Sequence, residues 1–528
     1  MSLDLLEAVA GVRVAGRPQG RPAVEIDPAL LQWLEQGRRV IEAAVDAPRA
    51  TYGVNTGFGH LGYVRVSPRL AAELQHNLIR SHAIGVGPAL TLEQSRAVLF
   101  LRLSSLARGY SGVRPAVVLQ LAGMLNADRI PVIPAWGSVG ASGDLVPLAH
   151  VALALVGEGE VWSSQGRRMP AAQALAEAGM APLRLEAKEG LALVNGTEVT
   201  TAVGALALAT LERLVITSDI ACALTIEALG GSAEPFDARL AELRPHPQAL
   251  AVAANVRALL QGSGRLRVPG DGPPQDAYSL RAVPAIHGSA RSLFAWAAGI
   301  AVTEMNSVVD NPLVFPEAQV ILSGANFHAQ PVALAWDACR IGVATMANVI
   351  ERRIDRLVNP HTSGGLPPFL TLRSGLRSGL MMAQYVAASL AADCRALAGP
   401  WSVHTIPTSA GQEDVVSMGT QAALAFEGAV RRLARLVALE LVTAAQAAQY
   451  RDAPLSPAGA AVLEWVRAQV PSVHDEDRAL SGYVEQVSER VAAGEVIEQV
   501  RRASPALRLA GFVPVDGAGP GSGAGGPG

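Results

Sequence analysis

The chain has 528 residues, of which 50% are hydrophobic and 17% charged, and its formal net charge at pH 7 is −3. This composition allows a large buried core and gives no basic footprint for nucleic acid or an anionic membrane surface. The three cysteines (Cys222, Cys339, Cys394) are far apart, which favours reduced thiols. The N-terminal segment lacks the pattern of a secretory signal and the longest apolar stretch is interrupted by charges, so we expect a cytoplasmic protein.

Helical patterns come first along the chain. Asp27-Pro28 is typical of a helix start, with an N-cap residue followed by proline in the first turn. The apolar residues that follow fall on one helical face: Leu30, Leu31, Leu34, Ile41 and Val45. Polar loops rich in Gly, Pro and Asn interrupt the chain at 51–62, 131–144, 194–197, 262–276, 309–331, 359–368 and 405–413. Such loops are where a rigid scaffold presents functional residues.

Helical spacing dominates the rest of the chain. Residues from about 200 to 450 are rich in Ala, Leu and Arg with few strand signals, and a late apolar stripe consists of Leu480, Val484, Val487 and Val491. We therefore predict a mainly α fold, an elongated bundle of long helices. Its expected parts are a loop-rich N-terminal domain (1–200), a helical-bundle core (201–515) and a Gly/Pro tail (516–528) that cannot bury a core and should be disordered.

Three common kinds of site are disfavoured. Gly57, Gly59 and Gly62 match G-x-G-x-x-G, but no convincing strand precedes them, which argues against a dinucleotide site. Neither the histidines nor the cysteines have metal-ligand spacing, so we expect no metal. The only lysine is Lys188, and a pyridoxal-phosphate enzyme would depend on it entirely; a codon bias toward arginine explains its isolation equally well.

The segment "GSVGASGDLVPLAH" (137–150) concentrates glycine and serine before an apolar run. Ser142 or Asp144 could cap a helix that begins near Leu145, and Ser142 could also be a nucleophile with a distant histidine. A more specific possibility involves Ala141-Ser142-Gly143. In a tight bend the Gly143 nitrogen can attack the Ala141 carbonyl carbon, because glycine and a small neighbour leave room. Ring closure and loss of the Ser142 hydroxyl remove two waters and leave an electrophilic methylidene imidazolone.

The same segment resembles the signature of the aromatic amino acid ammonia-lyase family, whose prosthetic group is 4-methylidene-imidazol-5-one (MIO). Further segments resemble its histidine ammonia-lyase branch in order: "TYGVNTGFG", "NLIRSHAIGVG", "EGLALVNGT", "QDAYSLR", "DNPLVF", "GANFHAQP", "LPPFL" and "PTSAGQEDVVSMG". The resemblance implies the ammonia-lyase fold, with MIO formed autocatalytically from Ala141-Ser142-Gly143 in the N-terminal domain and no dissociable cofactor. It also implies a homotetramer in which three subunits build each site.

The resemblance assigns roles to individual residues. Tyr52 is expected to be the base that removes the β proton, as a phenolate favoured by helix N-termini aimed at the site. Tyr278 assists catalysis, and Arg281, three residues later, binds the substrate carboxylate. The remaining substrate-binding residues are His82, Asn195, Gln275, Phe327 and Glu413. Of these, Asn195 and Gln275 are expected to hydrogen-bond the imidazolone or the substrate, and Phe327 to shield the ring.

Glu413 favours L-histidine as the amino acid substrate, because a carboxylate can accept a hydrogen bond from an imidazole N–H. Against an apolar ring the carboxylate would lose its hydration and gain no hydrogen bond. The expected product is trans-urocanate. Three residues depart from the histidine-lyase pattern: Val415 replaces histidine, Gly411 asparagine and Glu198 glutamine. A tyrosine or phenylalanine ammonia-lyase, or an aromatic amino acid 2,3-aminomutase, therefore stays open as an alternative. The third hypothesis is a catalytically inert helical scaffold or binding protein that keeps the family fold.

Overall fold

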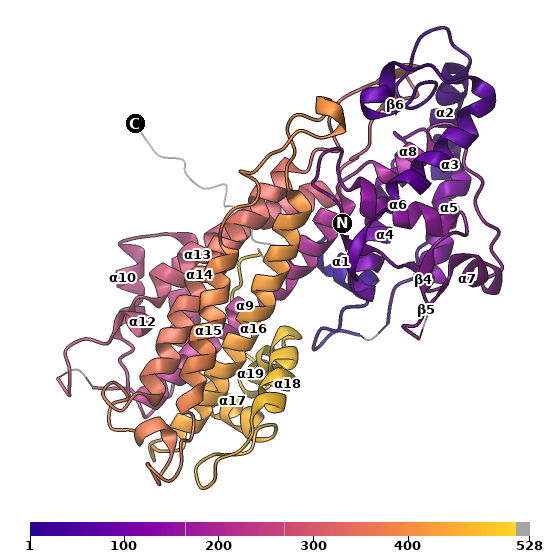
Figure 1. Cartoon of the computed structure of the whole chain (residues 1–528). Helices are drawn as coiled ribbons and strands as arrows, with labels where there is room; N and C mark the ends of the chain where they lie inside the picture. The colour runs from indigo at the N-terminus through magenta and orange to yellow at the C-terminus, as the bar shows by residue number, and fades with distance from the viewer. Residues whose placement is uncertain (19, 164, 269, 514–528) are drawn as a thin grey trace, which may run out of the picture.

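The computed structural model describes residues 1–18, 20–163, 165–268 and 270–513. The molecule is elongated, with a bundle of long helices at one end and a part built from shorter helices and strands at the other (Figure 1). The tail predicted for 516–528 lies outside the described residues. The expected mainly α, elongated bundle is confirmed by this architecture.

The bundle is built around one helix that is apolar on every side, α9 (Glu198–Leu229). All of its residues except Thr210, Glu212 and Leu229 are buried, as expected for a helix with no polar face. By length and composition α9 could cross a membrane, but 83% of its most apolar window is buried inside the protein. Around it pack α11 (Pro247–Leu259), α13 (Val283–Met305), α14 (Gln330–Val358) and α16 (Gly419–Ala448), with α15 (Met381–Leu397) on α14 and α16.

Ion pairs are buried within this apolar bundle. Asp219 of α9 accepts hydrogen bonds from Arg291 (2.7 Å) and His287 (3.0 Å) of α13. Arg353 of α14 donates to both carboxylate oxygens of Glu440 of α16, at 2.6 and 2.9 Å. Because removing one partner would leave a buried charge unpaired, at a cost of about 3–5 kcal/mol, these pairs define how the helices fit together.

The N-terminal part is a layer of shorter helices. They are α1 (Leu3–Ala10), α2 (Pro28–Val45), α3 (Ala71–His82), α4 (Leu92–Ala107), α5 (Pro115–Asn126), α6 (Leu145–Leu155), α7 (Ala171–Glu177) and α8 (Glu189–Val194). Short antiparallel pairings join β1 (Val86–Ala89) to β3 (Pro134–Trp136), and β4 (Glu160–Trp162) to both β2 (Ile130–Pro131) and β5 (Arg168–Pro170). α4 packs against α9, which ties this part to the bundle.

The remaining elements cover the ends and flanks. They are α10 (Ala238–Glu242), α12 (Tyr278–Arg281), α17 (Pro457–Arg467), α18 (Ser481–Ala492), α19 (Glu495–Ala503), the hairpin β6 (Leu313–Phe315) and β7 (Val320–Leu322), and the 3₁₀ turns η1 (Gly59–Tyr63), η2 (Pro68–Leu70), η3 (Glu234–Phe236), η4 (Pro368–Leu370) and η5 (Ser409–Gly411). α12 lies far along the bundle from α6 and α8 (Figure 1).

Two helix predictions are confirmed in detail. Asp27 caps α2 by accepting from the Ala29 amide, with Pro28 in the first turn. The stripe that includes Val487 and Val491 is the buried face of α18. The boundary expected at residue 200 falls in the first turn of α9, so the division into domains stays a prediction.

Candidate active site

The segment Ala141-Ser142-Gly143 lies in a bend between β3 and α6. Three glycines of this bend have positive φ: Gly137 (144°), Gly140 (66°) and Gly143 (75°). These conformations are available to glycine without the steric penalty of a side chain. Gly143 pairs with Gly196 as a parallel bridge, and a Cβ at position 143 would overlap the Gly196 carbonyl. The bend therefore requires glycine at 143 for its conformation and for its packing.

Asp144 anchors the end of this bend in the protein interior. Its fully buried carboxylate accepts hydrogen bonds from Ser138 (3.0 Å), from the Thr200 amide (2.7 Å) and hydroxyl (2.9 Å), and from Thr420 (2.7 Å). Burial raises the pKa of Asp144, and these donors oppose the rise. The prediction that Asp144 is an N-cap residue is confirmed for the start of α6 at Leu145, but its carboxylate makes no capping hydrogen bond. The carboxylate instead binds α9 and α16.

Asn195 faces the tripeptide from the end of α8. Its Nδ2 donates to the Ser142 carbonyl oxygen at 2.9 Å, while its buried Oδ1 has no hydrogen-bond partner in the described parts of the chain. The side chain thus offers one unused acceptor next to the predicted electrophile.

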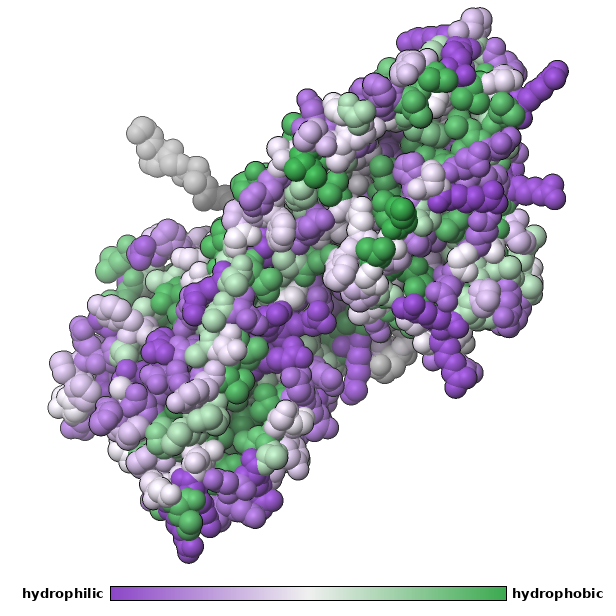
Figure 2. Space-filling model, viewed as in Figure 1, coloured by the Kyte–Doolittle hydropathy of each residue, from purple (hydrophilic) through white to green (hydrophobic). Residues whose placement is uncertain are grey.

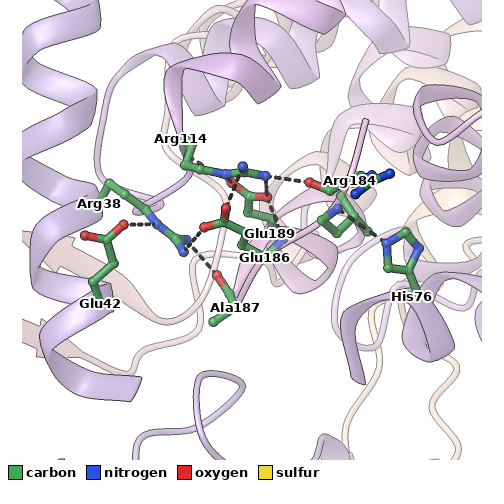
Figure 3. Close-up of polar contacts among 9 residues, drawn as sticks. Arg38, Glu42, His76, Arg114, Arg184, Glu186, Ala187 and Glu189 are labelled. Carbon is green, nitrogen blue, oxygen red and sulfur yellow. Dashed lines mark hydrogen bonds and ion pairs between the residues drawn. The ribbon is translucent and has the colours of Figure 1, made fainter. Parts of the chain in front are cut away.

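Ionic contacts fix the segment that leads into α8 (Figure 3). The buried Glu189 carboxylate accepts from Arg114 Nε (2.8 Å) and Nη2 (2.7 Å), and Arg38 donates to Glu186 (2.7 Å). Lys188 is fully buried and pairs with Asp310 at 2.6 Å. Burial lowers the pKa of Lys188, with the Asp310 charge opposing. In this structure Lys188 acts as an anchor for α8 at the residue before its first turn.

Glu413 lies opposite Asn195 across Ser142. Its Oε1 accepts a hydrogen bond from Ser142 Oγ at 2.6 Å, and its Oε2 accepts one from Thr408 Oγ1 at 2.7 Å. A backbone bridge between Thr408 and Glu413 closes the turn that carries η5. The carboxylate is therefore held on one oxygen and directed at the tripeptide with the other.

Tyr52 is a half-buried residue of the loop that docks on η5. Its hydroxyl accepts from the Gly59 amide at 2.9 Å, and the His60 amide next to it donates to Ser409 Oγ at 3.2 Å. Burial raises the pKa of Tyr52, the Gly59 hydrogen bond opposes the rise and the Glu413 charge adds to it. Within one chain the single amide donor does not offset burial, so stabilisation of the phenolate by helix N-termini stays a prediction.

His82 is the last residue of α3, also near Glu413. Its Nδ1 lies 3.1 Å from Ser81 Oγ. Burial lowers the pKa of His82, whereas a backbone hydrogen bond to Leu78 and the Glu413 charge oppose the change. Burial thus disfavours the charged form of the imidazole.

The other predicted residues lie elsewhere. Tyr278 is 71% exposed on α12, and the Arg281 guanidinium carbon lies 4.9 Å from the centre of its ring. The pair shares a helical face as the spacing predicted, but at the distant end of the bundle, and Gln275 is exposed in the loop before it. Phe327 is half-buried just before α14, where the adjacent His328 lies 3.3 Å from the Val415 carbonyl. Among the described residues, one chain therefore brings Tyr52, His82, Asn195 and Glu413 together around Ala141-Ser142-Gly143. Phe327 lies next to the His328–Val415 contact, whereas Gln275, Tyr278 and Arg281 lie apart from this group.

Sequence reasoning missed the residues that position these groups. Thr408 holds Glu413, and Arg102 Nη1 donates to the Asn195 carbonyl at 2.9 Å and to Glu198 at 3.1 Å. Thr408 lies in the quoted segment "PTSAGQEDVVSMG", so its place in that segment was an available signal. Arg102 lies within an ordinary helical pattern, which offers no signal of its contact with Asn195.

Comparison with known proteins identifies the family of the chain. A sequence model described as aromatic amino acid lyase matches residues 6–468. The chain belongs to the aromatic amino acid lyase family. Among the relatives of this lyase are histidine ammonia-lyases from Deinococcus radiodurans, 46% identical over 91% of each chain, and from Geobacillus kaustophilus, 49% identical over 84% of this chain and 88% of the relative.

Solved structures agree on the fold of the lyase. A tyrosine aminomutase from Streptomyces globisporus superposes with a TM-score of 0.90 at 37% identity, covering 97% of this chain and 98% of the other. A histidine ammonia-lyase from Trypanosoma cruzi gives 0.86 at 35% identity, covering 97% and 94%. The predicted resemblance to ammonia-lyases is confirmed.

Proposed function

We propose that this protein eliminates ammonia from L-histidine and releases trans-urocanate. The observation that carries the proposal is the Glu413 carboxylate, which points its Oε1 at Ser142 within a site of half-buried aromatic residues. A carboxylate there binds an imidazole N–H through a charge-assisted hydrogen bond. The histidine ammonia-lyase relatives, similar over most of their length, support the same substrate.

The residues of the bend fit the MIO group that the family implies. Glycine is required at 143, Ala141 is small, and the unused Oδ1 of Asn195 can accept an N–H next to the ring. Asn195 and the Gly143–Gly196 contact would hold the group in place. When formed, MIO supplies an electrophilic methylidene carbon that captures the substrate amine and makes it a better leaving group.

The chain's own residues perform the remaining tasks. Glu413, fixed by Thr408, orients the imidazole of the substrate, and His82, whose charged form burial disfavours, lies near the same carboxylate. Tyr52 removes the β proton; the Gly59 amide at 2.9 Å stabilises the phenolate that does so. Phe327 closes the site toward Val415 and excludes water.

Gln275, Tyr278 and Arg281 complete the site of a second copy in this proposal. They lie at the opposite end of the bundle, where Gln275 and Tyr278 are exposed. Arg281 is half-buried, and its buried Nε has no hydrogen-bond partner in the described parts of the chain. Large side chains with apolar surface are exposed on the bundle helices, among them Trp296, Ile341, Met382 and Tyr385. Figure 2 shows green, hydrophobic patches on the visible face of the bundle. Large exposed apolar surfaces favour association, which supports a homotetramer with sites built from three subunits.

The same proposal includes a cytoplasmic location, supported by three buried free cysteines. A tyrosine 2,3-aminomutase is the second candidate, favoured by the structural similarity to the Streptomyces globisporus enzyme. Both reactions start with the same elimination, so the products distinguish them.

The test is to incubate the purified protein separately with L-histidine, L-tyrosine and L-phenylalanine, then separate acrylates from β-amino acids by chromatography. We expect urocanate from histidine and no β-amino acid. Coumarate, cinnamate or a β-amino acid without urocanate would replace the histidine assignment by one of the alternatives. Intact-protein mass spectrometry should also find the chain lighter by two water molecules.

A further inference from the structure

A buried ion pair lies directly behind the Asn195–Gly196 turn. Arg102 of α4 is fully buried, and its Nη1 donates to the Asn195 carbonyl at 2.9 Å and to Glu198 Oε2 at 3.1 Å. The pair leaves no space at Gly196, where a Cβ would overlap both Arg102 Nη1 and Glu198 Oε2. The main chain at 195–196 thus rests on this pair.

The other side of the same turn rests on the tripeptide. The Gly196 carbonyl accepts from the Asp144 amide at 2.6 Å, and Asn195 Nδ2 donates to the Ser142 carbonyl at 2.9 Å. A shift of Arg102 would therefore move Asn195 and Gly196 relative to Ser142 without any direct contact between Arg102 and the substrate.

Several charged groups surround Glu198. Arg102 faces it from α4, Asp144 from the bend before α6, and Asp310 from the segment after α13. Lys188 is paired with Asp310, and Glu304 of α13 accepts from Thr197, next to Glu198, at 2.7 Å. Carboxylates outnumber cations in this cluster. Burial raises the pKa of Glu198 to about 7; the Asp144 and Asp310 charges add to the rise, and Arg102 opposes it.

The pair also has free hydrogen-bonding capacity. Glu198 Oε1 accepts no hydrogen bond in the described parts of the chain, and Arg102 Nε and Nη2 donate none. Glu198 Oε1 lies 3.1 Å from Arg102 Nη1 but accepts no hydrogen bond from it, so this oxygen can take up a proton without breaking one. The carboxyl group can therefore exist in both states within one backbone arrangement.

We propose that Glu198 is a positioning residue whose ionised form holds Arg102, and through it the Asn195–Gly196 turn, against the tripeptide. This inference rests on the proposed function. When Glu198 is protonated, Arg102 becomes a buried cation bound only to neutral acceptors, which is unfavourable. The guanidinium then relaxes away from Asn195, so turnover falls as pH decreases through about 7.

The test compares kcat and KM between pH 6 and 8 for the wild type, Glu198→Gln and Glu212→Gln. We expect the ratio of wild-type kcat to Glu198→Gln kcat to rise about fivefold across this range, as a charge-assisted contact replaces a neutral one, with little change in KM. Glu198→Gln, which resembles the protonated state, should keep only the rise that deprotonation of Tyr52 gives to both enzymes. A rise caused by the substrate's own groups would persist in Glu198→Gln.

Glu212→Gln is the matched control on the same helix. Its carboxylate also has a pKa raised by burial, but it binds the Phe512 amide (3.0 Å) rather than the site. This variant should keep the wild-type profile. A Glu198→Gln enzyme that keeps the same rise in kcat, or a wild type without one, would overturn the proposal.

Infrared difference spectra of the wild type against Glu198→Gln provide a readout that needs no substrate. We expect a protonated-carboxyl band that disappears with a midpoint near pH 7 and is absent in the variant. If histidine is not turned over but this band titrates, the histidine assignment fails and the kcat comparison is repeated with the amino acid that is turned over. If no such band titrates between pH 6 and 8, the inference about Glu198 fails whatever the substrate.

Discussion

Ser142 donates a hydrogen bond of 2.6 Å to Glu413, although 271 positions separate them in the sequence. The residue predicted to become the electrophile therefore directly faces the residue predicted to recognise the substrate ring. Thr408 holds the second carboxylate oxygen, which keeps Glu413 in this orientation. The distance between the site of amine capture and the ring-binding group is thus determined by the 408–413 turn.

Glu413→Gln should lower kcat/KM for histidine by about 10- to 100-fold, because a hydrogen bond to a charged group contributes roughly 1.5–3 kcal/mol. Steady-state kinetics with histidine and phenylalanine measure the change in preference. Activity toward phenylalanine should not fall, since its ring makes no hydrogen bond to the carboxylate. Asp414→Asn is the control, because it removes an exposed charge one residue away. An equal loss for both substrates would contradict the ring-binding role.

The raised pKa of Tyr52 predicts a limb of the pH profile on which kcat/KM increases toward alkaline pH. A base must be deprotonated, and burial and Glu413 hold the pKa of Tyr52 above its ordinary value, so kcat/KM should rise with pH toward that value. Glu413→Gln removes the negative charge, lowers the pKa of Tyr52 and should move this limb to lower pH. Tyr52→Phe should lose the limb. A profile with the limb intact in Tyr52→Phe would assign the base to another group.

Gly143→Ala should prevent maturation, whereas Gly179→Ala should not. Both glycines have similar positive φ, 75° and 69°, so each substitution carries a left-handed penalty of about 1–2 kcal/mol. A Cβ at 143 overlaps the Gly196 carbonyl, but a Cβ at 179 has no atom within 4 Å. Intact mass and thermal melting distinguish the two effects. If Gly143→Ala still loses two waters, the close contact with Gly196 is not required for cyclisation.

The sequence predicted the helices and the reactive segment because both depend on local patterns. The caps and apolar stripe of α2, the stripe of α18 and the glycines around Ser142 are all short-range features. The partners of Asp144 could not be predicted, since Thr200 and Thr420 approach it only when α9 and α16 pack together. The raised pKa of Tyr52 likewise depends on its burial against η5. Motif matching placed Tyr278 in the site but could not show that one chain presents it at the far end of the bundle.

Mixed tetramers test whether sites are shared between subunits. Ser142→Ala and Tyr278→Phe should each be nearly inactive alone. In the proposed arrangement, equal co-expression should restore about a quarter of wild-type activity, because a site is intact when one variant supplies Ser142 and the other supplies Tyr278. Co-expression of Ser142→Ala with Asn195→Ala is the control: the Asn195 side chain binds the Ser142 main-chain carbonyl within one chain, so no site regains both residues. Recovery in neither mixture, with mixed tetramers verified by native mass spectrometry, would mean that Tyr278 serves the site of its own chain or none.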